Sequence, residues 1–119
     1  MPISLKRAYE AAAAGDGTRI LVERLWPRGL AKDAAKIDLW PKGAAPSTAL
    51  RKWFDHDPDR WEEFRRRYVA ELDENEESLE PILEAVRRGP VTFVFASRET
   101  RYNNADALRD YVEDRLTRT

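Results

Sequence analysis

The chain has 119 residues, a length that predicts a single domain over residues 1–119 with one hydrophobic core. It carries 21 basic and 22 acidic residues for a net charge of −1, whereas proteins that coat nucleic acid are usually strongly basic. It has no cysteine, which excludes disulfides, a thiolate nucleophile and cysteine metal ligands, and its one histidine, His56, leaves no histidine cluster for zinc.

The apolar stretches of the chain are short. None approaches the roughly 20 residues that a membrane-spanning helix needs, and the N-terminal residues lack the apolar run of a signal peptide. We therefore expect a cytoplasmic protein with no membrane partner.

The first half of the chain predicts two strands. Residues 3–5 alternate apolar and polar side chains and indicate a short strand, and the alanine-rich residues 9–14 indicate one or two helical turns. Residues 19–25 contain three consecutive apolar side chains, which is typical of a strand covered on both faces. Residues 31–36 favour a short helix, and residues 38–43 favour an ordered loop anchored by a tryptophan.

The second half of the chain predicts four helices and one strand. Ser47 is an N-cap residue for a helix through residue 54, and Asp57 with the proline after it starts a second helix. A Gly-Pro pair at residues 89–90 ends a third helix, and residues 91–96 are β-branched and aromatic, as a strand requires. The apolar faces of the last three helices are Trp61, Phe64, Tyr68 and Leu72, then Leu79, Ile82, Leu83 and Val86, then Ala105, Leu108, Val112 and Leu116.

Strands that alternate with helices predict a small α/β domain. We expect a short, mostly parallel sheet of about three strands flanked by helices. In such a sheet the loops after residues 22–25 and after residues 95–96 leave from the same carboxyl edge, where α/β domains bind ligands.

The loop after the second predicted strand carries the most informative motif. Arg24, Trp26 and Arg28 lie in a short segment that a proline and a glycine make rigid. The two arginines are candidates for binding a phosphate or carboxylate, and Trp26 for packing on the ligand. The alternatives are that each arginine pairs with a structural carboxylate and that Trp26 seals the core under the loop.

Other polar residues are expected around the same crevice. Lys32, Lys42 and Arg51 would add positive charge, and Ser47 with Arg51 would meet an anion near a helix N-terminus. The alternative is that Ser47 only caps the helix and that Arg51 only snorkels to the surface. Two asparagines, Asn103 and Asn104, are candidates for orienting the ligand, although helix capping alone would explain one of them.

Three residues are candidates for acid–base chemistry. Glu23 and Glu99 would form a carboxylate pair, for acid–base chemistry or for Mg²⁺, if the strand ends that carry them are neighbours and face the same side. His56 lies between two aspartates before a proline, where it is either a general base or a turn residue. The sequence predicts no metal site, and it does not identify a cofactor.

Four segments occur in a fixed order and together resemble a known family. They are residues 19–30, 37–42, 45–58 and 103–108. They resemble the YeaO-like branch of the uncharacterised family called domain of unknown function 488, over essentially the whole chain. The resemblance implies that the motif residues act together, but it implies no particular activity.

The chain departs from that family pattern in three places. The family usually has aspartate at the position of Glu23 and often at the position of Glu99. More distant members have a Cys-His-Arg signature in the loop after the last strand, whereas residues 101–105 contain neither a thiol nor an imidazole. Cysteine chemistry in those relatives therefore does not carry over.

These patterns lead to two functional hypotheses. The first is a protein or enzyme that binds a small anionic molecule, such as a nucleotide or phosphorylated metabolite, in the crevice at the carboxyl edge of the sheet. The alternative is a non-catalytic regulatory module that binds nucleic acid or a protein, which the net charge of −1 disfavours for nucleic acid. The sequence does not indicate an oligomeric state.

Overall fold

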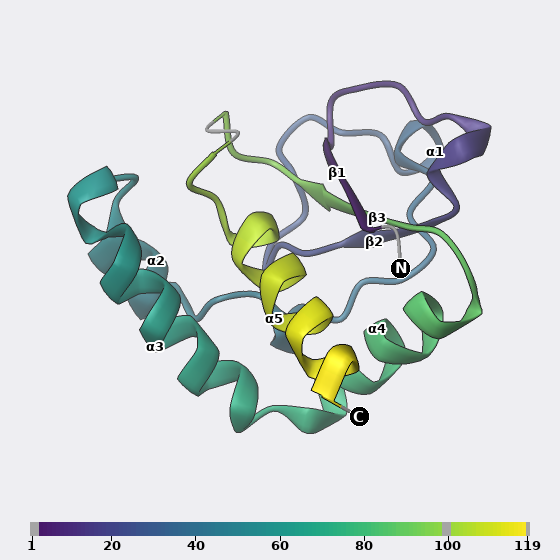
Figure 1. Cartoon of the computed structure of the whole chain (residues 1–119). Helices are drawn as coiled ribbons and strands as arrows, with labels where there is room; N and C mark the ends of the chain where they lie inside the picture. Colours follow the sequence, from purple (N-terminus) through teal and green to yellow (C-terminus); the bar gives the residue numbers. More distant parts are fainter. Residues whose placement is uncertain (1–2, 99–100, 119) are drawn as a thin grey trace.

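The last predicted strand is the centre of the sheet. The computed structural model describes residues 3–98 and 101–118, and in it β3 (Val91–Phe95) pairs in parallel with β1 (Ile3–Arg7) and with β2 (Thr18–Leu21). The strand order is β1-β3-β2, which confirms the predicted three-stranded parallel sheet (Figure 1). All five residues of β3 are buried, as a central strand covered on both faces requires.

The two faces of the sheet are covered differently. One face contributes Ile20, Phe93 and Phe95 to the main core, together with the helix residues Tyr68 and Leu108. The other face carries a smaller cluster of Ala8, Leu21 and Val94, covered by four half-buried side chains of the long loop that follows β2. These side chains are Trp26, Leu30, Ile37 and Trp40.

The helices follow the predicted order. They are α1 (Lys32–Ala35), α2 (Thr48–Phe54), α3 (Trp61–Asp73), α4 (Glu76–Arg88) and α5 (Asn104–Arg118). In Figure 1, α5 lies between α3 and α4, and the three helices lie on the same side of the sheet. The apolar faces predicted for these helices are buried, except that Leu116 is only partly so.

Two local predictions were wrong. Residues 9–14 do not form helical turns: a bend leads into a single 3₁₀ turn at Ala14–Asp16, because so short a segment with no apolar face cannot sustain a helix. The second strand ends at Leu21 and not at residue 25, although Val22 still donates its N–H to the Val94 carbonyl at 3.0 Å. The next residues leave the sheet, because β3 itself ends at Phe95.

A glycine sets the close approach of β2 to β3. Gly17 has a φ of 66°, and a Cβ added there would lie 2.2 Å from the Pro90 carbonyl oxygen. The next residue, Thr18, donates its N–H to that same oxygen at 3.1 Å. No other residue type fits both the left-handed backbone and this contact.

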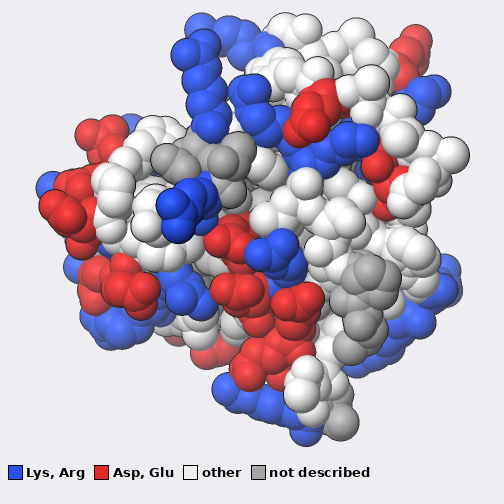
Figure 2. Space-filling model, turned by 45° about the horizontal axis from the view of Figure 1, so that its top comes forward, with Lys and Arg blue, Asp and Glu red and all other residues white. Residues whose placement is uncertain are grey.

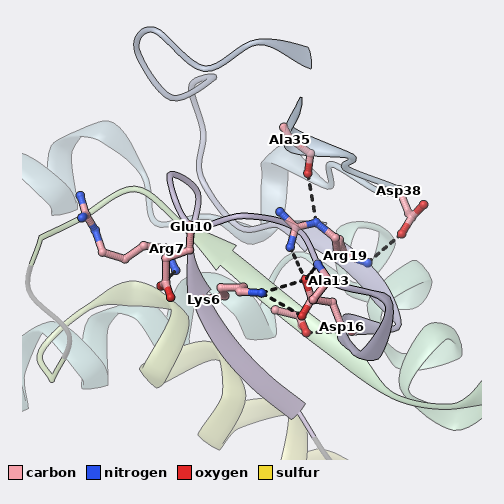
Figure 3. A network of polar contacts seen from close by, with 9 residues as sticks. Lys6, Arg7, Glu10, Ala13, Asp16, Arg19, Ala35 and Asp38 are labelled. Atoms are coloured by element: carbon pink, nitrogen blue, oxygen red, sulfur yellow. Dashed lines mark hydrogen bonds and ion pairs between the residues drawn. The ribbon is translucent and has the colours of Figure 1, made fainter. Parts of the chain in front are cut away.

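A buried arginine anchors the amino end of β2 (Figure 3). Arg19 is 3% exposed, and its guanidinium donates to the Ala35 carbonyl at 3.0 Å and to the Asp16 carboxylate at 2.6 Å. Asp16 also forms an ion pair with Lys6 at 3.1 Å and accepts the N–H of Ala13 at 3.0 Å. The Ala13 N–H and then the two cations hold the pKa of Asp16 below its ordinary value.

Candidate functional site

A cavity of about 530 Å³ opens at the carboxyl edge of the sheet. It lies between the residues after β2, the residues after β3, the C-terminal half of α2 with the turn after it, and the start of α5. This is the edge at which the sequence predicts a binding crevice. The volume is in the usual range for small-molecule sites.

A buried carboxyl group lies in the floor of the cavity. Glu23 is 5% exposed, and its Oε2 accepts the N–H of Ala96 at 3.0 Å. Burial raises the pKa of Glu23, and this effect outweighs the opposing effects of the Ala96 N–H, the Arg51 charge, the Asn104 amide and His56. The groups around Glu23 therefore offset only part of the cost of burying its negative charge.

The two predicted asparagines hold this edge together. The Asn103 side chain accepts the N–H of Asp106 at 3.0 Å, which confirms the predicted cap of α5. The Asn104 amide donates to the Val22 carbonyl at 2.7 Å and so ties α5 to the end of β2. Both asparagines also line the cavity.

The walls of the cavity are aromatic, and its exposed rim carries two cations and one carboxylate, that of Asp55. Phe54 and Phe64 are buried in the wall, and Tyr102 is half-buried beside them. Arg51 and Lys52 are exposed at the rim, and within residues 3–98 and 101–118 neither forms an ion pair. Two positive charges at the mouth of a cavity attract anions from solution.

His56 reaches the rim through an unusual turn. Asp55 and His56 both have positive φ, of 47° and 55°, which is uncommon outside glycine and costs about 1 kcal/mol or more for each residue. The turn is closed by the Asp55 N–H, which donates to the Arg51 carbonyl, and by the Asp57 N–H, which donates to the Phe54 carbonyl. The imidazole is exposed and lies 6.4 Å from the Phe54 ring.

The arginines and the tryptophan of the predicted motif do not line this cavity. Arg24 donates to the carbonyls of Ala45 at 2.9 Å and Pro46 at 3.2 Å, so it joins two loops. Arg28 is exposed on the surface, and its carbonyl accepts the hydroxyl of Tyr9. Trp26 donates to the Leu30 carbonyl and packs edge-on against Trp40, 5.5 Å away, over the smaller core cluster. A ligand-binding role for these three residues stays a prediction.

The remaining candidates are divided among other places. Lys32 lines a smaller hollow of about 290 Å³ beside Trp26 and Trp40. Lys42 stacks its ammonium group over the Trp40 ring at 4.2 Å. Ser47 caps α2 by accepting the N–H of Leu50, and its hydroxyl donates to Glu71 at 2.6 Å. Lys32, Lys42, Ser47 and Arg51 were predicted to surround the same anion, and of these four only Arg51 lines the cavity.

One candidate cannot be placed, and the described residues offer no metal site. Glu99 lies outside the described residues, so its predicted pairing with Glu23 stays a prediction. In residues 3–98 and 101–118, no three carboxylate or imidazole side chains are grouped so that they would hold a metal ion.

Several residues that line the cavity were not predicted from the sequence. Phe54, Lys52, Tyr102 and the 72% exposed Leu25 line the cavity, but none was a candidate. Phe54 is typical of a core residue, and only the position of α2 beside the sheet edge brings it to the cavity. Leu25 is an exposed leucine in an ordered loop, and hydrophobic periodicity does not predict such exposure.

The side of the molecule drawn in Figure 2 shows no continuous basic face. The side seen in Figure 2 mixes basic and acidic side chains, with an acidic group near its centre. The run of three arginines at 65–67 is a solvated face of α3, because Arg66 and Arg67 pair with Glu63, at 2.5 and 2.8 Å, and Arg65 with Asp110 at 3.2 Å. The part of the chain that the structure describes contains no helix long and apolar enough to cross a membrane.

Comparisons with known proteins identify the family. Residues 2–119 match the family described as the inactive DUF488-N3 subclade. The chain is 38% identical to the uncharacterised protein YeaO of Escherichia coli K12 over 112 residues, which cover 94% of this chain and 97% of the relative. It is 36% identical to the uncharacterised protein Rv3073c of Mycobacterium tuberculosis H37Rv over 113 residues, 95% of each chain. No solved structure matches it. The chain belongs to the DUF488 family, in its YeaO-like branch.

Proposed function

We propose that this protein binds a small anionic molecule in the cavity at the carboxyl edge of the sheet, without transforming it. The observation that carries the proposal is the cavity itself, which has a buried carboxyl group in its floor and, at its rim, two cations that form no ion pair within residues 3–98 and 101–118. A structural role alone does not explain why Glu23 is buried beside an open volume of about 530 Å³.

The charges divide the cavity into two zones. The rim carries Arg51 and Lys52, which would hold an anionic group and increase the rate at which an anion reaches the site. The floor carries Glu23 and Asn104, which would receive the polar and uncharged end of the ligand. His56, which the strained turn presents at the rim, would contact the ligand beside Arg51.

Binding without turnover is the version that the comparisons favour. The matching family is described as an inactive subclade, and the loop at 101–105 has no thiol that would serve as a nucleophile. In this proposal Glu23 and His56, the candidates for acid–base catalysis, recognise the ligand. Steady release of a product from any compound that binds would contradict this part of the proposal.

The test is calorimetric titration of the whole protein with inorganic pyrophosphate and with ribose 5-phosphate. We expect saturable binding of at least one of the two, weakened about tenfold or more by Arg51→Gln, because the change removes a charged hydrogen bond to the anion. Arg87→Gln is the matched control, since Arg87 is an equally exposed helical arginine that does not line the cavity.

Two outcomes would overturn the proposal. One is that neither anion binds the wild type. The other is that Arg51→Gln and Arg87→Gln weaken binding equally, which would mean a diffuse effect of net charge. Arg24→Gln separates the loop from the cavity: we expect it to lower the unfolding temperature without weakening anion binding, because Arg24 joins two loops.

A further inference from the structure

Within residues 3–98 and 101–118, the Glu23 carboxylate and the Asn104 side-chain oxygen in the cavity floor have lone pairs that accept no hydrogen bond. The Glu23 carboxylate offers about four lone-pair positions, of which the Ala96 N–H and the Asn104 amide engage two. The Asn104 amide nitrogen donates to the Val22 carbonyl, and in the described chain no N–H donates to its side-chain oxygen. The floor therefore selects a ligand that presents N–H donors.

The cavity wall contains aromatic rings. Phe54 and Phe64 lie in it with their rings stacked at 4.5 Å, and the half-buried Tyr102 packs near them against Trp61, at 5.4 Å. Aromatic side chains of this kind stack on nucleobases and other planar heterocycles. The wall connects the acceptors of the floor to the cations of the rim.

We propose that the ligand is a guanine nucleotide, whose base presents its two adjacent N–H groups to Glu23 and Asn104 and whose phosphate lies against Arg51 and Lys52. This inference rests on the proposed function and adds the identity of the base. Guanine carries a ring N–H and an amino group side by side, whereas adenine and cytosine pair one amino group with an acceptor, and uracil flanks one N–H with two carbonyls. Only the guanine edge satisfies two neighbouring acceptors without placing a carbonyl against a carboxylate.

The test compares nucleoside monophosphates that differ by single groups, titrated into the whole protein. GMP is expected to bind at least about tenfold more tightly than AMP, CMP or UMP. IMP keeps the ring N–H of GMP but lacks the amino group, so it is expected to fall between GMP and AMP. This comparison changes only the ligand, and it therefore does not depend on how well a variant folds.

A substitution then assigns the preference to Glu23. Glu23→Gln replaces one acceptor by a donor and is expected to remove the preference for GMP over IMP, while the affinity for inorganic pyrophosphate, which has no uncharged end to reach the floor, stays within about twofold. Lys36→Gln is the control, because Lys36 is an exposed residue that does not line the cavity.

The results separate the two proposals. If ribose 5-phosphate and all five nucleotides bind equally, the cavity holds an anion but does not recognise the base, and this inference is wrong while the proposed function stands. If GMP is preferred but Glu23→Gln keeps that preference, the base is read elsewhere and the inference is wrong as well. If no nucleotide binds but pyrophosphate or ribose 5-phosphate does, this inference is wrong while the proposed function stands, and if none of these compounds binds, both proposals fail.

Discussion

The two ends of β2 each hold a carboxylate near an arginine, yet the protein treats them in opposite ways. At the amino end Asp16 is surrounded by Arg19, Lys6 and a backbone N–H, and these donors hold its pKa below the ordinary value. At the carboxyl end Glu23 is buried, and its pKa is raised because its donors do not offset the loss of water. The fold supplies the cations that neutralise Asp16, whereas Glu23 keeps hydrogen-bond acceptors that face a cavity.

This difference separates a structural group from a candidate ligand-binding group. A carboxylate whose partners are all supplied by the fold stabilises the native state, whereas one that lacks partners destabilises it until a ligand supplies them. Residue type does not distinguish the two cases, because both ends combine an acid with an arginine. The following experiments, from the largest expected effect to the smallest, test this comparison.

The largest effect is expected at the turn that begins β2. Gly17→Ala should lower the free energy of unfolding by about 3 kcal/mol or more, because it combines an unfavourable φ of 66° with a contact of 2.2 Å to the Pro90 oxygen. Gly29→Ala, in the loop beyond the other end of β2, is the matched control: its φ is 76°, but no atom lies within 4 Å of the added Cβ. The free energy of unfolding of Gly29→Ala should fall by only about 1 kcal/mol. If urea unfolding shows the same loss of stability for Gly17→Ala and Gly29→Ala, the contact with Pro90 is not what makes residue 17 intolerant of a side chain.

Asp16→Asn is expected to lower the unfolding temperature at pH 7 by several degrees. The folded-state pKa of Asp16 is below its ordinary value of 3.8, so its stabilising effect is present above that value and is lost as the pH falls through the folded-state pKa. The difference between variant and wild type should therefore disappear in acid. A difference that persists unchanged at the lowest pH would mean that the substitution acts through packing and not through charge.

Glu23→Gln is expected to leave the unfolding temperature at pH 7 unchanged or a few degrees higher. The folded-state pKa of Glu23 is above its ordinary value of 4.5, so the ionised group destabilises the fold at neutral pH, and this penalty fades as the pH falls toward 4.5. The advantage of the variant should fade over the same range. A loss as large as that of Asp16→Asn would show that Glu23 is a structural carboxylate.

The smallest effect is expected for an ion pair in water. Arg66 lowers the pKa of Glu63 to about 2, together with Arg67, but the three side chains lie on the solvent face of α3. Arg66→Gln should change the unfolding temperature by no more than the error of the measurement, because exposed pairs contribute little and are screened by salt. If Arg66→Gln changes the unfolding temperature as much as Asp16→Asn does, then the difference in burial between the Glu63 and Asp16 ion pairs does not determine how much each stabilises the fold.

The regular elements were predictable where a local pattern carries them. The apolar face of α3, from Trp61 to Leu72, and that of α4, from Leu79 to Val86, are buried as their spacing predicts. The caps at Ser47 and Asn103 also follow from local chemistry, since each side chain bonds a backbone N–H three residues further along. Hydrophobic periodicity and capping act within one helical turn, so a sequence displays them directly.

The site was predictable only as a region. Parallel strands bring their carboxyl ends to one edge, and the sequence therefore predicted a crevice beside Glu23 and Asn104. It did not predict that Arg24 donates to the carbonyls of Ala45 and Pro46, because every residue carries a carbonyl and a sequence marks none of them as a partner. Nor did it predict that Tyr102 lines the cavity, because the position of this side chain depends on packing against Trp61, which is distant in the sequence.

The sequence by itself determined the family, the parallel α/β sheet and the order of its helices, because motif order and periodicity are properties of the chain alone. Only the tertiary structure decided which charged groups are neutralised and which face open space. Arg19 and Glu23 are four residues apart and both buried, but α1 and the Ala14–Asp16 turn surround the first, while α2 and α5 stand apart over the second. Burial and partnership depend on segments that meet from distant parts of the chain, and so they follow from packing and not from local pattern.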